Sequence, residues 1–239
     1  MSQVAVAGCP EGIALAAESM VVSGERSYRL DAQKVIPLGL RLAFAGVGHA
    51  ALFDPRAPGQ LRRLKAYLDE LTNGFQAQGD PAETGRRLGQ FFVEILGHLA
   101  QYSRLWPHVA PVGWRTSFIV AGYARGAAVG LVSVWSASGE GAMLEAEWTT
   151  DEHPRAAMGA INRAGIAGAA RFARLGRRAD GGTLAGAVRD ALRVVEQARN
   201  AYPEYCGGRT HAATITPAAG LTWLAGHEPP DPSDEWRRM

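Results

Sequence analysis

The chain has 239 residues, of which 47% are apolar and 20% are charged, the balance of an ordinary globular protein. This length suits one larger domain. The 25 basic and 23 acidic side chains leave a net charge of +2, so no global field favours binding to nucleic acid or to an anionic membrane.

Cysteine and histidine usage argues against a metal site. The two cysteines, Cys9 and Cys206, have no C-x-x-C spacing, and the six histidines show no ligand spacing. The first apolar stretch, residues 4–7, is too short for a signal peptide, and no run approaches the length of a membrane span. We therefore expect a cytoplasmic protein with no cofactor, no metal, no nucleic-acid partner and no membrane segment.

Four short strands are predicted at the start of the chain. Small apolar residues at 4–7 and 13–17 are separated by turn glycines, and a second pair at 33–38 and 41–46 flanks Gly39. Because no helix lies between these strands, the chain does not begin with a βαβ unit.

Two helices are predicted next. Apolar residues repeat at helical spacing over 61–75 and more strongly over 88–102. Asp80 fits the N-cap of the second helix, with Pro81 at its first helical position.

The second half repeats this order. Strands are predicted over 116–122, 128–135 and 143–148, and a second helix pair over 154–172 and 184–198. The many Gly and Ala residues in the first helix of this pair indicate close packing against a neighbour. Final strands are predicted over 210–216 and 221–224. The proline-containing tail, residues 228–239, is predicted to be disordered.

This order predicts an α+β fold, a four-layer αββα sandwich. Two sheets face each other, and a helix pair covers each outer side, so that every apolar face is buried. No internal repeat or linker divides the chain, which gives a single domain over residues 1–227 followed by the tail at 228–239.

Four segments resemble, in order, segments of proteasome β-subunits and the related HslV peptidases. Each segment is a weak signal by itself, but all four lie in the right order on suitable elements, over residues 2–224. The fold this resemblance implies is the αββα sandwich of N-terminal-nucleophile hydrolases. The four segments are Gly12–Ser19 (similar to G-V-V-L-A-A-D-S), 34–46 (K-I-x-x-I…I-A-x-A-G), 118–123 (V-L-V-A-G-Y-D) and Cys206–Gly208 (S-G-G).

The spacing of three residues sharpens the resemblance. In this family the nucleophile is the first residue of the mature chain, an acid lies sixteen positions later, and a lysine lies sixteen beyond the acid. With Met1 removed, Ser2, Glu18 and Lys34 reproduce both steps. The resemblance therefore implies Ser2 as nucleophile, Lys34 as its electrostatic partner and Glu18 as the acid that orients Lys34.

The same resemblance implies the rest of the chemistry. The α-amine of Ser2, with an ordinary pKa of about 7.7–8.0, is close enough to working pH to act as the base. Gly46 lies where the family's oxyanion-binding glycine falls, and Gly48 is the next candidate if the loop is one residue shorter. Serine in place of the usual threonine is found in some bacterial homologues, notably the betaproteobacterial proteasome homologue.

The implied activity is peptide-bond hydrolysis on peptides or unfolded proteins. Subunits are expected to form stacked homo-oligomeric rings of six or seven, with the active sites inside. No cofactor is implied, and an ATPase unfoldase partner is left open.

Several departures from the family leave alternatives open. Glu18 stands in place of the usual Asp, residues 148–153 replace a G-S-G-S motif, and Pro203 and Cys206 replace an Asp and a Ser, with Glu204 a candidate substitute. A catalytically silent ring protein and a small-molecule amidase on the same scaffold therefore remain alternatives. Residues 46–51 also imitate the dinucleotide fingerprint G-x-G-x-x-A, but a hairpin precedes them where that reading needs a βα unit.

Overall fold

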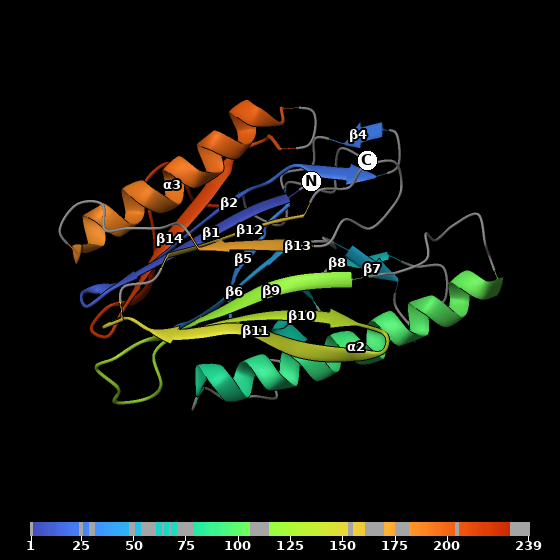
Figure 1. The fold of residues 1–239 in the computed structure, drawn as a ribbon, viewed down its shortest axis with the longest axis horizontal. Helices are drawn as coiled ribbons and strands as arrows, with labels where there is room; N and C mark the ends of the chain where they lie inside the picture. Colours follow the sequence, from blue (N-terminus) through green and yellow to red (C-terminus); the bar gives the residue numbers. More distant parts are fainter. Residues whose placement is uncertain are drawn as a thin grey trace.

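In the computed structural model, two antiparallel β-sheets stack face to face and helices cover their outer sides (Figure 1). The structure describes residues 2–23, 26–28, 32–47, 51–53, 61–63, 65–66, 68–70, 79–105, 115–152, 155–160, 170–174, 182–203 and 206–229.

The first sheet has six strands in the order β13-β12-β1-β2-β14-β15. Its strands are β1 (Ser2–Cys9), β2 (Gly12–Glu18), β12 (Arg155–Ala160), β13 (Ala170–Arg174), β14 (Thr210–Thr216) and β15 (Gly220–Trp223).

The second sheet has five strands in the order β11-β10-β9-β6-β5. They are β5 (Val35–Pro37), β6 (Leu42–Val47), β9 (Arg115–Gly122), β10 (Leu131–Ser138) and β11 (Gly141–Thr149). Two small hairpins that were not predicted pair β3 (Val21–Ser23) with β4 (Arg26–Tyr28) and β7 (Ala51–Phe53) with β8 (Leu61–Arg63).

Two long helices form the outer layers. Helix α2 (Pro81–Leu105) packs on β9, β10 and β11, and α3 (Leu184–Ala201) packs on β1, β2 and β14. The predicted N-cap of α2 is confirmed, because the Ala82 N–H donates to Asp80 Oδ1 at 3.0 Å. Thr183 caps α3 in the same way. Among the described residues, no helix is both long and apolar enough to cross a bilayer.

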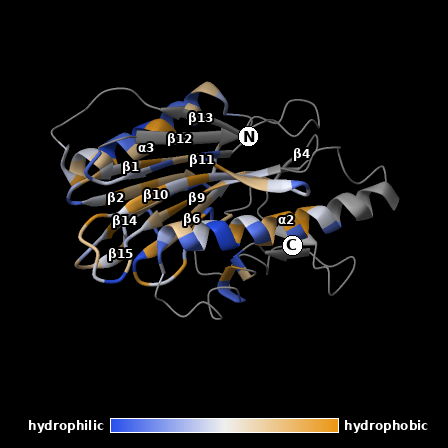
Figure 2. Ribbon diagram, turned by 60° about the horizontal axis from the view of Figure 1, so that its bottom comes forward, coloured by the Kyte–Doolittle hydropathy of each residue, from blue (hydrophilic) through white to orange (hydrophobic). Residues whose placement is uncertain are grey.

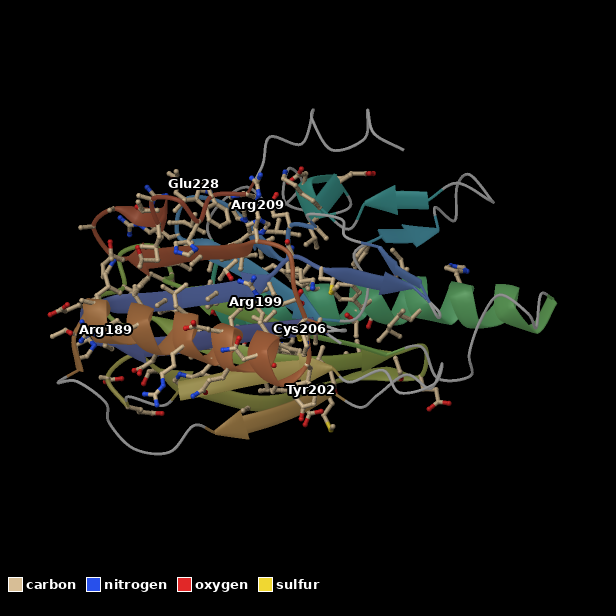
Figure 3. All side chains as sticks on the ribbon, turned by 90° about the horizontal axis from the view of Figure 1, so that it is seen from above. Arg189, Arg199, Tyr202, Cys206, Arg209 and Glu228 are labelled. Carbon is tan, nitrogen blue, oxygen red and sulfur yellow. The ribbon has the colours of Figure 1, made fainter. Side chains whose placement is uncertain are left out.

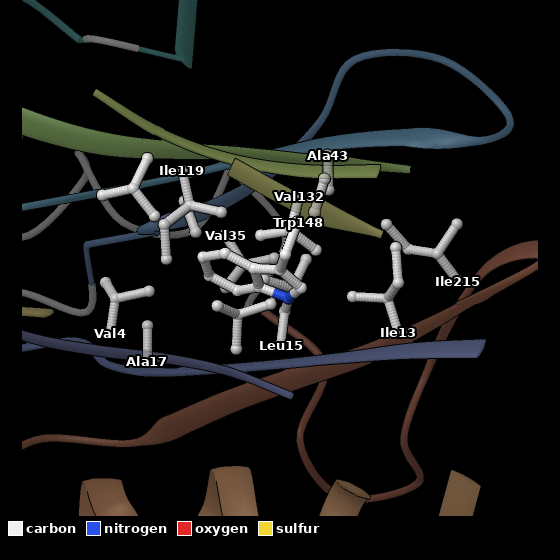
Figure 4. Close-up of a cluster of buried hydrophobic side chains, with 14 of the residues drawn as sticks. Val4, Ile13, Leu15, Ala17, Val35, Ala43, Ile119, Val132, Trp148 and Ile215 are labelled. Carbon is white, nitrogen blue, oxygen red and sulfur yellow. The ribbon is translucent and has the colours of Figure 1, made fainter. Parts of the chain in front are cut away.

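Three apolar clusters fill the spaces between these layers. Trp148 lies among aliphatic side chains of both sheets, including Val4 and Ile119 (Figure 4). Under α2 the cluster combines aliphatic side chains with packed aromatic rings: the ring centroid of Phe118 lies 5.1 Å from that of Phe92. Under α3 it consists mostly of alanines of β1, β2 and α3. Small side chains let this helix approach its sheet closely. The chain is therefore an α+β protein with two antiparallel sheets between helices.

The helix predicted over 61–75 is partly wrong. Residues 61–63 form β8, and helical structure is described only at 65–66 and 68–70. Leu68 is buried in the cluster under α2, so this segment belongs to the α2 layer. The periodic leucines did not show where the helix begins, because hairpin pairing with β7 takes the first three residues. Residues 71–78 lie outside the described ranges.

The helix predicted over 154–172 is wrong for the residues that the structure describes there. Residues 155–160 form β12 and pair with β1, and 170–174 form β13 and pair with β12. This stretch is rich in Ala and Gly, whose small side chains give a weak periodic signal. Pairing with the backbone of β1, which would otherwise be an unpaired edge, decides its conformation. Residues 161–169, and 230–239 of the predicted tail, lie outside the described ranges.

Candidate functional site

Glu18 and Lys34 form an ion pair where the two sheets meet. Glu18 ends β2 in the first sheet and is 0% exposed, whereas Lys34 lies just before β5 in the second sheet and is 6% exposed. Lys34 Nζ donates to Glu18 Oε1 and, at 2.6 Å, to the carbonyl oxygen of Met20. The two residues that the spacing singled out are thus in direct contact, and their catalytic roles stay a prediction.

The Glu18 carboxylate accepts hydrogen bonds from three separate parts of the chain besides Lys34. Its Oε1 accepts from the Gln3 N–H at 3.1 Å, and its Oε2 accepts from Met20 N–H at 2.7 Å and Gly207 N–H at 3.3 Å. A carboxylate buried this deeply is tolerated only when its charge is paired and its lone pairs are satisfied. Glu18 therefore joins the start of β1, the end of β2 and the turn after α3.

Ser2 is the first residue of β1, and its backbone is paired with Ala160 of β12. The N–H that Gln3 donates to Glu18 belongs to the peptide bond joining Ser2 to Gln3. The backbone of Ser2 is therefore held one peptide unit from the Glu18–Lys34 pair. Its side chain, and Met1, lie outside what the structure describes.

The Cys206–Gly208 segment returns from α3 to the same place. The Cys206 N–H donates at 2.8 Å to the carbonyl oxygen of Tyr202, the residue that caps the C-terminal end of α3 (Figure 3 labels both residues). Gly208 has a φ of +73° and lies against the Ser19 hydroxyl, and the Arg209 N–H donates to that hydroxyl at 2.8 Å. These contacts hold the Gly207 N–H against Glu18.

Burial has the largest effect on the pKa of Lys34. Burial lowers the pKa of Lys34 below its ordinary value of 10.5, and the Glu18 charge, which raises it, opposes this effect only in part. A buried cation at this position favours any nearby anion and disfavours any second nearby cation.

The two predicted oxyanion glycines have different outcomes. The Gly46 N–H donates to the carbonyl oxygen of Lys34 at 3.1 Å, so it is committed within the protein and is not free for a substrate. The same bond fixes the backbone of Lys34 beside β6. Gly48 lies outside the described residues. The dinucleotide reading of 46–51 loses support, because residues 51–53 form strand β7 where that fingerprint requires a helix.

The residues that depart from the proteasome-like motifs lie in different surroundings. Cys206 is buried, and a negative charge on it would raise the pKa of Lys34. Pro203 is exposed at the end of α3, whereas Glu204 lies outside the described residues. Trp148, at the start of the segment that replaces G-S-G-S, is a core residue between the sheets.

Sequence reasoning missed the backbone groups of Gln3, Met20 and Gly207. Main-chain amides leave no signature of residue type, so only Gly207 had a signal, through the S-G-G-like segment. Within the described ranges, no three His, Cys, Asp or Glu side chains gather in a way that could hold a metal ion. Comparison of the chain with models of known protein families and with curated proteins found no match.

Proposed function

We propose that this chain is a proteasome-type N-terminal-nucleophile hydrolase that cleaves peptide bonds with Ser2. One observation supports it above all others: the buried Glu18–Lys34 pair, sixteen residues apart in sequence, lies one peptide unit from the backbone of Ser2. A buried ion pair is seldom better for stability than apolar residues of the same size. The burial of the Glu18–Lys34 pair beside Ser2, the first residue of the central strand β1, therefore favours a chemical role for the pair.

The proposed reaction needs a free α-amine on Ser2, which requires removal of Met1. A serine hydroxyl is a weak nucleophile until a base takes its proton. The Lys34 ammonium favours the alkoxide and lowers the pKa of the amine through like-charge repulsion, so that the amine is neutral and can act as the base. Glu18 keeps Lys34 charged and in place.

The proposed reaction is an acyl transfer, first to Ser2 and then to water. Ser2 Oγ bonds to the scissile carbonyl carbon while its proton passes to the α-amine. Collapse of the tetrahedral intermediate breaks the C–N bond, and the amine returns that proton to the leaving peptide nitrogen. Water then attacks the ester, giving the carboxylic acid product and restoring the Ser2 hydroxyl. Because the Gly46 N–H is occupied, Gly48 is the proposed donor to the oxyanion.

The proposed substrates are peptides or unfolded chains, hydrolysed inside stacked homo-oligomeric rings in the cytoplasm. An ATPase unfoldase would be a natural partner for such rings. One observation favours the silent alternative: the position of the family serine is a buried cysteine, Cys206, whose thiol is a weaker hydrogen-bonding group.

The test is intact mass spectrometry of the purified chain before and after treatment with a peptide epoxyketone, which bonds to a hydroxyl and an amine on one residue. We expect a mass lacking Met1 and a single adduct that maps to Ser2. A chain that lacks Met1 and never labels would favour the silent ring protein. Labelling of a chain that stays monomeric or dimeric in light scattering would favour the small-molecule amidase.

A further inference from the structure

The end of β6 is held on both sides of the strand. On the side of β5, the Gly46 N–H donates to the carbonyl oxygen of Lys34 at 3.1 Å. On the side of β9, Val47 pairs with Ser117, and the carbonyl oxygen of Val47 accepts a hydrogen bond from the Thr116 hydroxyl at 3.0 Å. This hydroxyl belongs to a residue 69 positions further along the chain. A side chain from β9 therefore fixes the direction of the Val47 carbonyl.

Thr116 lies in the buried layer between the second sheet and α2. It is 2% exposed. Because alternate residues of a strand share one face, Thr116 lies on the same face of β9 as Phe118, which packs in the cluster under α2. Figure 2 shows α2 lying across the strands of this sheet. Water has little access to the Thr116 hydroxyl, so its bond to the Val47 carbonyl is strengthened by the low local dielectric.

The Val47 carbonyl belongs to the same peptide bond as the N–H of Gly48, the proposed donor to the oxyanion. A peptide bond is planar, and in the trans form its C=O and N–H point in opposite directions. A C=O that faces β9 is therefore followed by an N–H that faces the β5 side of the strand, where Lys34 lies. The hydrogen bond that the carbonyl accepts also makes the N–H a stronger donor, because linked hydrogen bonds polarise one another.

We propose that Thr116 is a positioning residue for the oxyanion. Its hydroxyl fixes the peptide bond after Val47, so that the N–H of that bond meets the negative oxygen formed when Ser2 attacks. Thr116 touches neither the substrate nor the reacting atoms, and it acts only through this peptide bond. Donors that are aimed before the reaction stabilise the transition state without reorganising. This role rests on the proposed function, since the oxyanion forms only if Ser2 is the nucleophile.

The test removes the hydroxyl with Thr116→Val, which keeps the size and branching of the side chain. In the full-length chain without Met1, we expect kcat for a peptide substrate to fall by about ten- to a hundredfold. KM should change by less than about twofold, because the oxyanion contact is made in the transition state and not in the bound substrate. Thr116→Ser keeps the hydroxyl and should restore kcat to nearly the wild-type value.

A peptide aldehyde gives a second readout, which a general loss of stability would not move. Ser2 Oγ adds to the aldehyde carbon and its proton passes to the aldehyde oxygen, so the oxygen of the resulting hemiacetal takes the place of the oxyanion. The affinity of Thr116→Val for the aldehyde should fall by the same factor as kcat/KM. Its affinity for the matching peptide alcohol, which forms no adduct, should equal that of the wild type.

The matched control is Thr84→Val. Thr84 is also buried, and its hydroxyl also donates to a main-chain carbonyl, that of Asp80 at 2.9 Å, but it lies at the start of α2. This variant should keep the kcat, KM and aldehyde affinity of the wild type. Urea unfolding of each variant reports folding. Should Thr116→Val not fold, Thr116→Cys takes its place: a thiol is a weaker donor than a hydroxyl, so its kcat should lie below that of Thr116→Ser.

Three results would overturn the role of the Thr116 hydroxyl: a wild-type kcat in Thr116→Val, a fall in kcat that Thr116→Ser shares, or an equal fall in Thr84→Val. Epoxyketone labelling of Ser2 in the wild type would still support the proposed function in each case. A wild-type chain that neither labels nor cleaves peptides overturns the proposed function, and the role of Thr116 with it.

Discussion

Lys34 donates a hydrogen bond to Glu18 across the boundary between the two sheets, although sixteen residues separate them along the chain. The pair is almost completely buried, and the carboxylate is also bonded by main-chain amides from three segments. One side chain therefore joins the start of β1, the end of β2 and the turn after α3.

Removal of one partner should be costly. Lys34→Met leaves the Glu18 charge buried and uncompensated, so we expect the free energy of unfolding to fall by about 3–5 kcal/mol in urea titrations. Glu18→Gln combined with Lys34→Met should recover part of this loss. Lys65→Met is the control, because the Lys65–Asp69 pair is 31% and 45% exposed and should contribute about 0–1 kcal/mol. Equal losses for the two lysine variants would contradict the buried pair.

Alkaline pH should stabilise the wild type relative to Lys34→Met. Because burial lowers the pKa of Lys34 below 10.5 in the folded state, the unfolded chain holds this proton to higher pH than the folded chain does. Between the two pKa values the unfolded state binds more protons, so the contribution of Lys34 to the free energy of unfolding rises with pH. Urea unfolding of both chains up to the ordinary lysine value measures this difference. A constant difference across that window would rule out the lowered pKa.

Substitution of Gly208 should disturb the Glu18–Lys34 pair indirectly, through the neighbouring Gly207. A β-carbon there would meet the Ser19 hydroxyl at a φ of +73°, and relief of that clash would shift the neighbouring Gly207 N–H from Glu18. We expect Gly208→Ala to lower both the free energy of unfolding and kcat. Gly126 has a similar φ of +77° with open space around it, so Gly126→Ala should cost only about 1–2 kcal/mol of backbone strain. An equal effect of both variants on kcat would mean that the Ser19 contact does not matter.

Ser2 variants separate the nucleophile from the scaffold. Ser2→Ala should abolish epoxyketone labelling and lower peptidase activity by at least about a thousandfold, with no change in unfolding. Ser2→Thr keeps both the hydroxyl and the amine and should keep labelling. Ser138→Ala is the control: Ser138 ends β10, where its hydroxyl accepts from the Glu140 N–H of the following turn, far along the chain from Ser2, and the variant should keep labelling and activity. Activity that survives in Ser2→Ala would exclude the proposed mechanism.

Local sequence signals predicted most of the regular structure. Alternating or continuous apolar runs marked β1, β2, β9 and β14, and the helical repeat with Asp80 before Pro81 marked α2. These elements are readable because each has a long apolar face or a capping residue of its own. The Glu18–Lys34 contact was also expected, but from the spacing of a resembling family and not from any local preference.

Tertiary structure decided the rest. Residues 155–160 have no strong preference of their own, and they form a strand because the outer edge of β1 needs hydrogen-bond partners. The Gly207 N–H reaches Glu18 only because the turn after α3 folds back over the end of β2. Such backbone contacts between distant segments depend on how the layers stack, which the order of residue types along the chain does not specify.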